Sequence, residues 1–221
     1  MGIISLEQTD RLYWLGRYSE RVYTTIRLFS QRYDIMIDEI EESYGEFCRS
    51  LEIPNIYTSS RDFCRRYCFD ETDPNSIYSN LIRAYDNAVV LREELGSETL
   101  SYIQLAIYDM NKAKTSEAPI LQFQKISDNI LAFWGMVDDS IASEKVRNII
   151  KSGKRIERID LYARLKLPRN KMEREVMRLA DRIPKSGMNY EQERVAELLG
   201  LVRMPELDYY QIVQNLESII R

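Results

Sequence analysis

Apolar residues recur at helical spacing along the first fifty residues of the chain. The series is Leu15, Tyr18, Val22, Ile26, Phe29, Tyr33, Met36, Ile40, Tyr44, Phe47 and Leu51. Steps of three and four residues keep such positions on one face of an α-helix. Ser5 and Gln8 have the spacing of a capping box, which places the start of this helix at Ser5. We expect a break or kink near Gly45 and an end before Pro54.

The rest of the chain also has helical patterns, separated by capping residues, glycines and prolines. The expected helices cover residues 60–69, 74–95, 97–113, 120–141, 143–167, 170–182, 189–200 and a last segment from 205. Asp73 is the expected N-cap of the second of these helices, with Pro74 at its first position. No segment alternates convincingly with a period of two.

The expected fold is therefore all-α. It is an antiparallel multi-helix bundle of long helices over residues 1–167, with a small helical C-terminal extension, 168–221, packing on the bundle. The scarcity of turn residues agrees, because the 221 residues include only 8 glycines and 6 prolines.

Composition excludes several kinds of chemistry. The chain has no histidine, which excludes histidine metal ligands and Ser-His or Cys-His nucleophiles. No run of about 20 apolar residues and no signal peptide is present, so a soluble cytoplasmic protein is expected. Three cysteines, Cys48, Cys64 and Cys68, fit a reducing compartment as plain thiols. We expect no metal and no cofactor.

Charge is unevenly distributed along the chain. The net charge is −4, yet residues 145–185 contain 14 Lys and Arg against five Asp and Glu. Such a segment could bind nucleic acid or an acidic partner, or it could complement the protein's own acidic half. The internal role is preferred, because no nucleic-acid-binding motif accompanies the segment.

Residues 11–29 and 148–166 align without a gap at an offset of 137, with five of 19 positions identical. In each segment a glycine, a Glu-Arg pair and an arginine recur, and the glycine, glutamate and last arginine lie on one line of the helix. Gly16 and Gly153 would let another helix or a ligand approach closely. The two segments therefore read as an internal repeat.

The charged residues on these lines fall where core residues belong. The expected buried set is Glu20, Glu157 and Asp160 against Arg27, Arg92 and Arg164. Buried charges must pair, so we expect the repeat helices to pack antiparallel with Glu20 beside Arg164 and Glu157 beside Arg27. Arg21 and Arg158 would lie at the rim.

Three roles are open for this cluster. It could fix helix register only, or it could form a pocket in which an arginine holds a carboxylate or phosphate. A carboxylate-bridged metal pair is disfavoured, because three arginines would repel cations and Glu-x-x-His is impossible here.

These residues resemble the Alpha-E family, bacterial all-helical proteins with a recurring Glu-Arg motif. The stretches are Leu12-Tyr13-Trp14-Leu15-Gly16-Arg17-Tyr18 with Glu20-Arg21, then Asn75-Ser76-Ile77 with Arg83, Asn87, Arg92 and Glu93, and then Gly153 with Glu157-Arg158 and Asp160. The likeness covers about residues 9–165, and the chain looks like a shortened member. It departs from the family pattern at Tyr85-Asp86 and at Val89.

The resemblance implies that this protein is a partner of a circularly permuted ATP-grasp ligase. Such ligases, together with transglutaminase-like peptidases, often accompany Alpha-E proteins. A non-catalytic helical partner or scaffold of an ATP-grasp-type peptide or amide ligase is therefore the preferred function. The alternative is an enzyme or small-molecule binder that uses the Glu/Asp–Arg cluster, and nucleic-acid binding through 145–185 comes third. A protein partner is expected and a homo-oligomer is possible, whereas membrane association is not expected.

Overall fold

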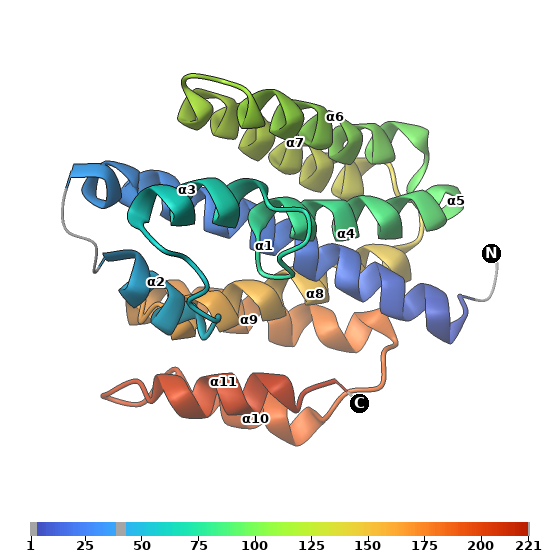
Figure 1. The fold of residues 1–221 in the computed structure, drawn as a ribbon. Helices are drawn as coiled ribbons and strands as arrows, with labels where there is room; N and C mark the ends of the chain where they lie inside the picture. The colour runs from blue at the N-terminus through green and yellow to red at the C-terminus, as the bar shows by residue number, and fades with distance from the viewer. Residues whose placement is uncertain (1–3, 39–42, 221) are drawn as a thin grey trace. The chain divides into compact units, whose positions relative to one another are not determined.

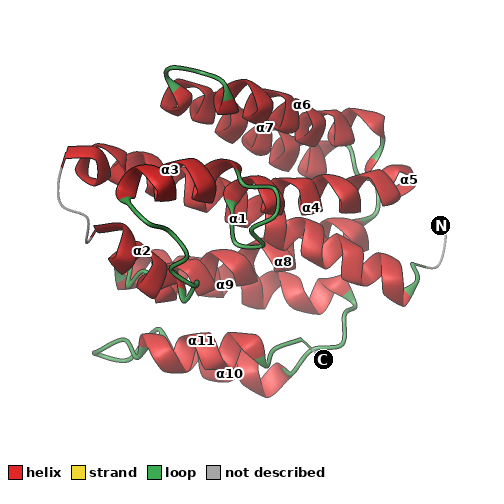
Figure 2. Ribbon diagram, in the orientation of Figure 1, coloured by secondary structure: helices red, strands yellow, loops and turns green. Residues whose placement is uncertain are grey.

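The computed structural model describes residues 4–38 and 43–220, except the side chains of 32–38 and 43. Within this part of the chain, eleven α-helices and no β-strand are present (Figure 2). The one pairing of extended backbone in these residues is an isolated antiparallel bridge between Tyr190 and Ile220. The all-α prediction is confirmed.

The helices follow one another with short connections (Figure 1). They are α1 (Leu6–Asp38), α2 (Ser43–Leu51), α3 (Ser60–Phe69), α4 (Ile77–Val90), α5 (Arg92–Leu95), α6 (Ser97–Lys114), α7 (Pro119–Asp139), α8 (Glu144–Arg164), α9 (Arg169–Ser186), α10 (Gln192–Leu201) and α11 (Tyr209–Glu217). None of the helices in the described residues is both long and apolar enough to cross a bilayer.

Several helix starts agree with the sequence signals. The amide of Gln8 donates to Ser5 Oγ at 3.1 Å, and the amide of Ser5 donates back to Gln8 Oε1 at 2.9 Å, which is a complete capping box. Ser59 and Ser143 cap α3 and α8 through their hydroxyl oxygens. The apolar position Ile40 lies outside the described residues.

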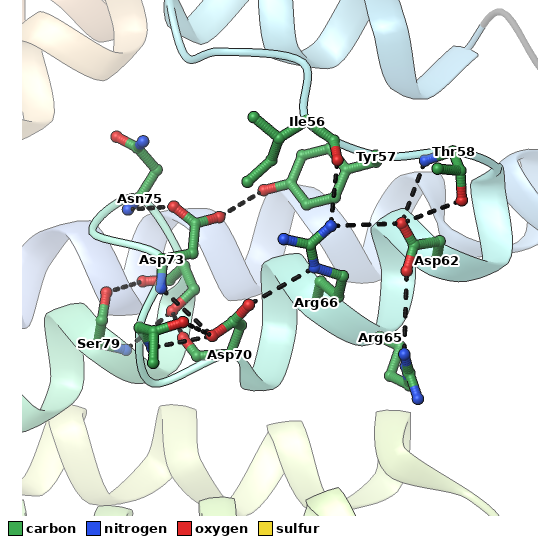
Figure 3. A network of polar contacts seen from close by, with 12 residues as sticks. Ile56, Tyr57, Thr58, Asp62, Arg65, Arg66, Asp70, Asp73, Asn75 and Ser79 are labelled. Atoms are coloured by element: carbon green, nitrogen blue, oxygen red, sulfur yellow. Dashed lines mark hydrogen bonds and ion pairs between the residues drawn. The ribbon is translucent and has the colours of Figure 1, made fainter.

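The start of α4 differs from the prediction. The N-cap is Ser76, whose hydroxyl accepts from the amide of Ser79 at 3.0 Å. Asp73 instead accepts hydrogen bonds from the Tyr57 hydroxyl at 2.8 Å and from the Asn75 amide at 2.9 Å (Figure 3). Asp73 therefore orders the loop before the helix, and Asx-type bonds of this kind compete with capping.

The predicted helix 74–95 is also divided in two. Leu91 separates α4 from the single turn α5, with φ −92° and ψ 20°. The amide of Leu91 still donates to the Asn87 carbonyl at 3.0 Å, so the chain deviates from helical geometry by one residue without losing its direction.

The chain forms two compact units. Unit 1 contains Met1–Arg17 and Ser143–Arg221, and unit 2 contains Tyr18–Ala142. In unit 1, α8 packs against α9 and α11, and α10 packs against α9 and α11. The division at residue 167 that the sequence suggested stays a prediction.

Unit 2 is organised around aromatic rings. Its α6 and α7 form a helical hairpin, and α4 packs against α3 and α6. Phe63 of α3 lies at 5.0 Å, ring centroid to centroid, from Tyr67 and at 5.7 Å from Phe47. Phe29 of α1 contacts Phe63 at 6.3 Å and Phe123 of α7 at 5.9 Å. These five rings are at most 2% exposed and form the core of the unit.

Candidate functional site

Two glycines form the base of the candidate site in unit 1. A Cβ on Gly16 would overlap the carbonyl oxygen of Ile150 and lie 3.0 Å from the amide nitrogen of Lys154. A Cβ on Gly153 would overlap the carbonyl oxygen of Tyr13 and lie 3.3 Å from the amide nitrogen of Arg17. The backbones of α1 and α8 therefore touch at this point, as only glycine permits.

The two contacts are equivalent under the sequence offset of 137. Ile150 and Lys154 lie three residues before and one residue after Gly153. Tyr13 and Arg17 have the same positions around Gly16. This is the close approach that the glycines were expected to allow.

The two helices cross with the same direction. Tyr13 meets Gly153, and one turn further along both helices Arg17 meets Glu157. In Figure 1, residues 6–17 of α1, which belong to unit 1, and α8 both run from the right of the view to the left. For this part of the repeat, the predicted antiparallel packing is therefore wrong. A helical wheel gives the face of each helix that is buried, but it carries no information on direction.

An ion pair lies directly above the crossing. Arg17 Nε donates to Glu157 Oε2 at 2.7 Å, and the side chains are 20% and 1% exposed. The guanidinium also lies 5.0 Å from the ring centroid of Trp14 and donates to the Tyr13 hydroxyl at 3.4 Å. Burial alone would lower the pKa of Arg17, but Glu157 raises it above its ordinary value. The guanidinium is thus permanently charged and held by a buried carboxylate.

A second ion pair continues along α8. Arg164 Nε donates to both carboxylate oxygens of Asp160, at 3.0 and 3.1 Å, and its Nη2 reaches Glu217 of α11 at 3.2 Å. Burial raises the pKa of Asp160, and the charge of Glu157 raises it further, against the opposing effect of Arg164. This pair ties α8 to α11.

A third carboxylate was absent from the sequence prediction. Glu175 of α9 is completely buried and contacts Arg155 and Arg158 of α8. On its own helix it pairs with Arg174 and Arg178, at 3.3 and 3.2 Å. Burial alone would raise the pKa of Glu175, but the arginines, Arg155 first, lower it below its ordinary value. Four arginines of the basic segment thus compensate one internal acid.

The other predicted residues belong to unit 2. Glu20 is fully buried in unit 2 and accepts a hydrogen bond from Thr24 Oγ1 at 2.7 Å, and Arg21 is half-buried. Arg27 and Arg92 are exposed, which contradicts their expected burial. Arg27 lies over the ring of Tyr23 at 5.4 Å, and Arg92 donates to Ser97 Oγ at 3.2 Å.

Long arginine stems explain the two errors, because they carry the charged group from an apolar stripe to water. The expected pairs Glu20 with Arg164 and Glu157 with Arg27 join residues of different units, and they stay predictions.

Sequence reasoning missed Arg17 and Glu175 as network residues. Arg17 directly follows the crossing glycine, and Glu157 lies one turn after the other glycine, so the repeat itself held the signal. Glu175 lies on α9 between Met172 and Leu179, where an acidic residue interrupts a buried stripe. Over residues 4–38 and 43–220, no three or more Cys, Asp or Glu side chains are grouped as metal ligands.

A family model covers residues 8–209 of the chain. It describes Alpha-E, a predicted alpha-helical domain with a conserved ER motif. The chain belongs to the Alpha-E family. No curated protein and no solved structure matches it. The family description names an ER motif, and this chain has Glu-Arg at Glu20-Arg21 in unit 2 and, in unit 1, at Glu157-Arg158, Glu173-Arg174 and Glu193-Arg194.

Proposed function

We propose that this Alpha-E protein is a non-catalytic helical partner or scaffold for an ATP-grasp-type peptide or amide ligase. The observation that carries the proposal is the Arg17–Glu157 pair at the glycine crossing. The carboxylate of Glu157, in the second Glu-Arg motif, is paired with the guanidinium of Arg17 at 2.7 Å. A group that is held in this way stabilises a helix crossing, whereas a general acid or base needs access to substrate.

Surface composition supports an interface on unit 2. Large apolar side chains on α6 and α7 are exposed by 45–69%, namely Leu105, Tyr108, Leu121 and Leu131. Exposed apolar side chains that gather on a few elements are typical of binding surfaces, and tyrosine is enriched in interfaces. A transglutaminase-like protein or a second copy of the chain could use the same helices.

Co-expression with the ATP-grasp-type ligase of the same organism tests the proposal. The wild-type chain should co-purify with the ligase, and Leu105→Asp with Tyr108→Asp should reduce recovery at least about tenfold, as for loss of an interface hot spot. Tyr210→Asp is the matched control, because Tyr210 is 67% exposed but lies on α11 of unit 1. A chain that never associates with the ligase, or ligase activity that is indifferent to it, would contradict the proposal.

The two alternative functions have less support. A carboxylate or phosphate bound in the Glu-Arg cluster of unit 1 would have to displace Glu157 from Arg17, or Asp160 and Glu217 from Arg164. Nucleic-acid binding through 145–185 would need the arginines of this segment, and some of them already compensate the buried charge of Glu175. A steep fall of affinity with salt would be required for that function.

A further inference from the structure

A pocket in unit 2, remote in sequence from the Glu-Arg motifs, combines cations with aromatic walls. One part has a volume of about 430 Å³ and is lined by Arg65, Arg66, Phe69, Asp70 and Lys114. A second part of about 210 Å³ shares Arg65, Phe69 and Lys114. Because the two parts share three residues, we treat them as one pocket, formed by α3 and the turn between α6 and α7.

The cations of this pocket differ in how firmly they are held. Arg66 is committed, because it contacts Asp62 at 3.6 Å and Asp70 at 3.5 Å and donates to the Ile56 carbonyl at 3.1 Å. Arg65 contacts Asp62 only at 4.0 Å, and its side chain is 78% exposed. Figure 3 shows Arg66 joined to Asp62, Asp70 and Ile56, whereas Arg65 lies at the edge of the network and is joined to Asp62 alone.

Two further cations line the same space. Lys114 pairs with Glu71 at 3.1 Å, but both side chains are about half exposed, so water screens this pair. Arg61, one turn before Arg65 on α3, is exposed and lines the smaller part. Arg61, Arg65 and Lys114 can therefore all turn toward a ligand. Among the described residues that line the space, Asp70 is the one carboxylate, and Arg66 compensates it.

The opposite wall is aromatic. Phe69 lies 5.8 Å from Phe123, centroid to centroid, and Phe123 meets Phe29 edge to face at 5.9 Å. Phe29 and Phe123 are nearly fully buried, so they form a fixed floor, and Phe69 is partly open to the space. A flat apolar body on this floor would gain both area burial and ring contacts.

We infer that this pocket binds a small organic anion with an aromatic body, an aryl phosphate or an aryl carboxylate. The ring would lie on Phe69 and the phenylalanine floor, and the anionic group would be held by Arg65 and Lys114, with Arg61 at the side. Arginine forms paired hydrogen bonds with both phosphate and carboxylate, so the two acids share one recognition chemistry. This inference is independent of the ligase partnership.

Cys64 provides a reporter inside the pocket. It lines the smaller part and is half-buried, whereas Cys48 and Cys68 are buried. Burial raises the pKa of Cys64 to about 11, so its alkylation is slow near neutral pH and is best followed near pH 9. A bound ligand would cover the thiol and slow its alkylation.

The test measures maleimide alkylation of Cys64 in the full chain by peptide mass spectrometry. The probes are 1-naphthyl phosphate, 1-naphthoate, 1-naphthol and inorganic phosphate. At a probe concentration ten times its Kd the rate should fall about elevenfold. The two naphthyl anions should protect at far lower concentration than naphthol or inorganic phosphate, and their ranking shows whether phosphate or carboxylate is preferred.

Charge variants make the test specific. Arg65→Gln and Lys114→Gln should each weaken protection by 1-naphthyl phosphate about tenfold, as for loss of one charge-assisted hydrogen bond. Lys112→Gln is the matched control, because Lys112 lies on the same turn of α6 but does not line the pocket. All are exposed positions, and circular dichroism confirms folding.

Protection by naphthol equal to that by the anions would overturn the inference, as would no protection by either naphthyl anion. An equal loss in Lys112→Gln would also overturn it, because the anion would then respond to net charge alone.

Discussion

The interior of unit 1 is ionic at its helix contacts, whereas the interior of unit 2 is aromatic. In unit 1, Glu157 and Glu175 are buried and pair with guanidinium groups. In unit 2, Phe63 is surrounded by rings of Tyr57, Tyr67 and Phe47 within 5.7 Å. Apolar burial supplies stability without direction, and buried ion pairs supply position at a desolvation cost. Apolar burial therefore supplies the stability of unit 2, whereas buried ion pairs in unit 1 also fix the positions of its helices.

Replacement of Phe63 by alanine is expected to have the largest effect. Phe63 is fully buried, so the cavity and lost transfer energy should lower the free energy of unfolding by about 3–5 kcal/mol. Urea denaturation measures it. Tyr210→Ala, at a 67% exposed ring, should change stability by about 0.5 kcal/mol or less. Similar losses in both variants would mean that the aromatic cluster is not the core of unit 2.

Replacement of Glu175 by glutamine should cost about 3 kcal/mol at pH 7, because its arginines lose a buried counter-charge. The folded-state pKa of Glu175 is lowered, so its contribution is present above the unfolded pKa, near 4.3, and is lost as pH falls through the folded pKa. Glu175→Gln should therefore flatten the acid limb of the stability–pH curve.

Glu173→Gln, two residues away on α9, is the control for this variant and should change stability at pH 7 by about 0.5 kcal/mol or less. An unaltered limb in Glu175→Gln would show that the four arginines do not depend on this carboxylate.

Replacement of Gly153 by alanine should destabilise by about 2–3 kcal/mol, because the new methyl overlaps the Tyr13 carbonyl and forces α1 and α8 apart. Gly135 is a matched helical glycine with no atom within 4 Å of an added Cβ. Gly135→Ala should instead stabilise by about 0.5–1 kcal/mol, through the helix propensity of alanine. If urea denaturation showed that both variants change the free energy of unfolding in the same direction, the backbone contact between Gly153 and Tyr13 would be contradicted.

Loss of a helix cap should have the smallest effect, and it should be similar in the two units. Ser143 caps α8 in unit 1, and Ser76 caps α4 in unit 2. Each change to alanine should cost about 1 kcal/mol, and threonine should restore most of it. Thermal denaturation of both variants gives the comparison. A much larger loss at Ser76 alone would show that its bond to the Asp70 carbonyl matters more than the cap.

Local signals predicted the helices well, because they depend on neighbours in sequence. The capping box at Ser5 formed as expected, and the helices expected at 60–69 and 143–167 begin next to the N-caps Ser59 and Ser143. The error at Asp73 has the same origin, since a turn and a cap use the same aspartate geometry. The Tyr57 hydroxyl donates to Asp73 and favours the turn. These two residues are 16 apart, so a short window of sequence does not contain both.

The site was predicted less completely. Periodicity identified the buried carboxylates Glu20, Glu157 and Asp160, and the glycines indicated a close approach. Helix direction and the choice of partner depend on three-dimensional packing, and the length of arginine side chains allowed Arg27 and Arg92 to reach water.

The Arg17–Glu157 ion pair is the central contact between α1 and α8 in unit 1, and a double-mutant cycle tests it most directly. Urea denaturation of Arg17→Met, Glu157→Gln and the double variant should give a coupling energy of about 1.5–3 kcal/mol. The exposed pair Lys185–Asp181, at 2.8 Å on α9, should give a much smaller coupling energy, because water screens it. Additive losses at Arg17 and Glu157, within about 0.5 kcal/mol, would contradict the claim that the second Glu-Arg motif holds this helix crossing together.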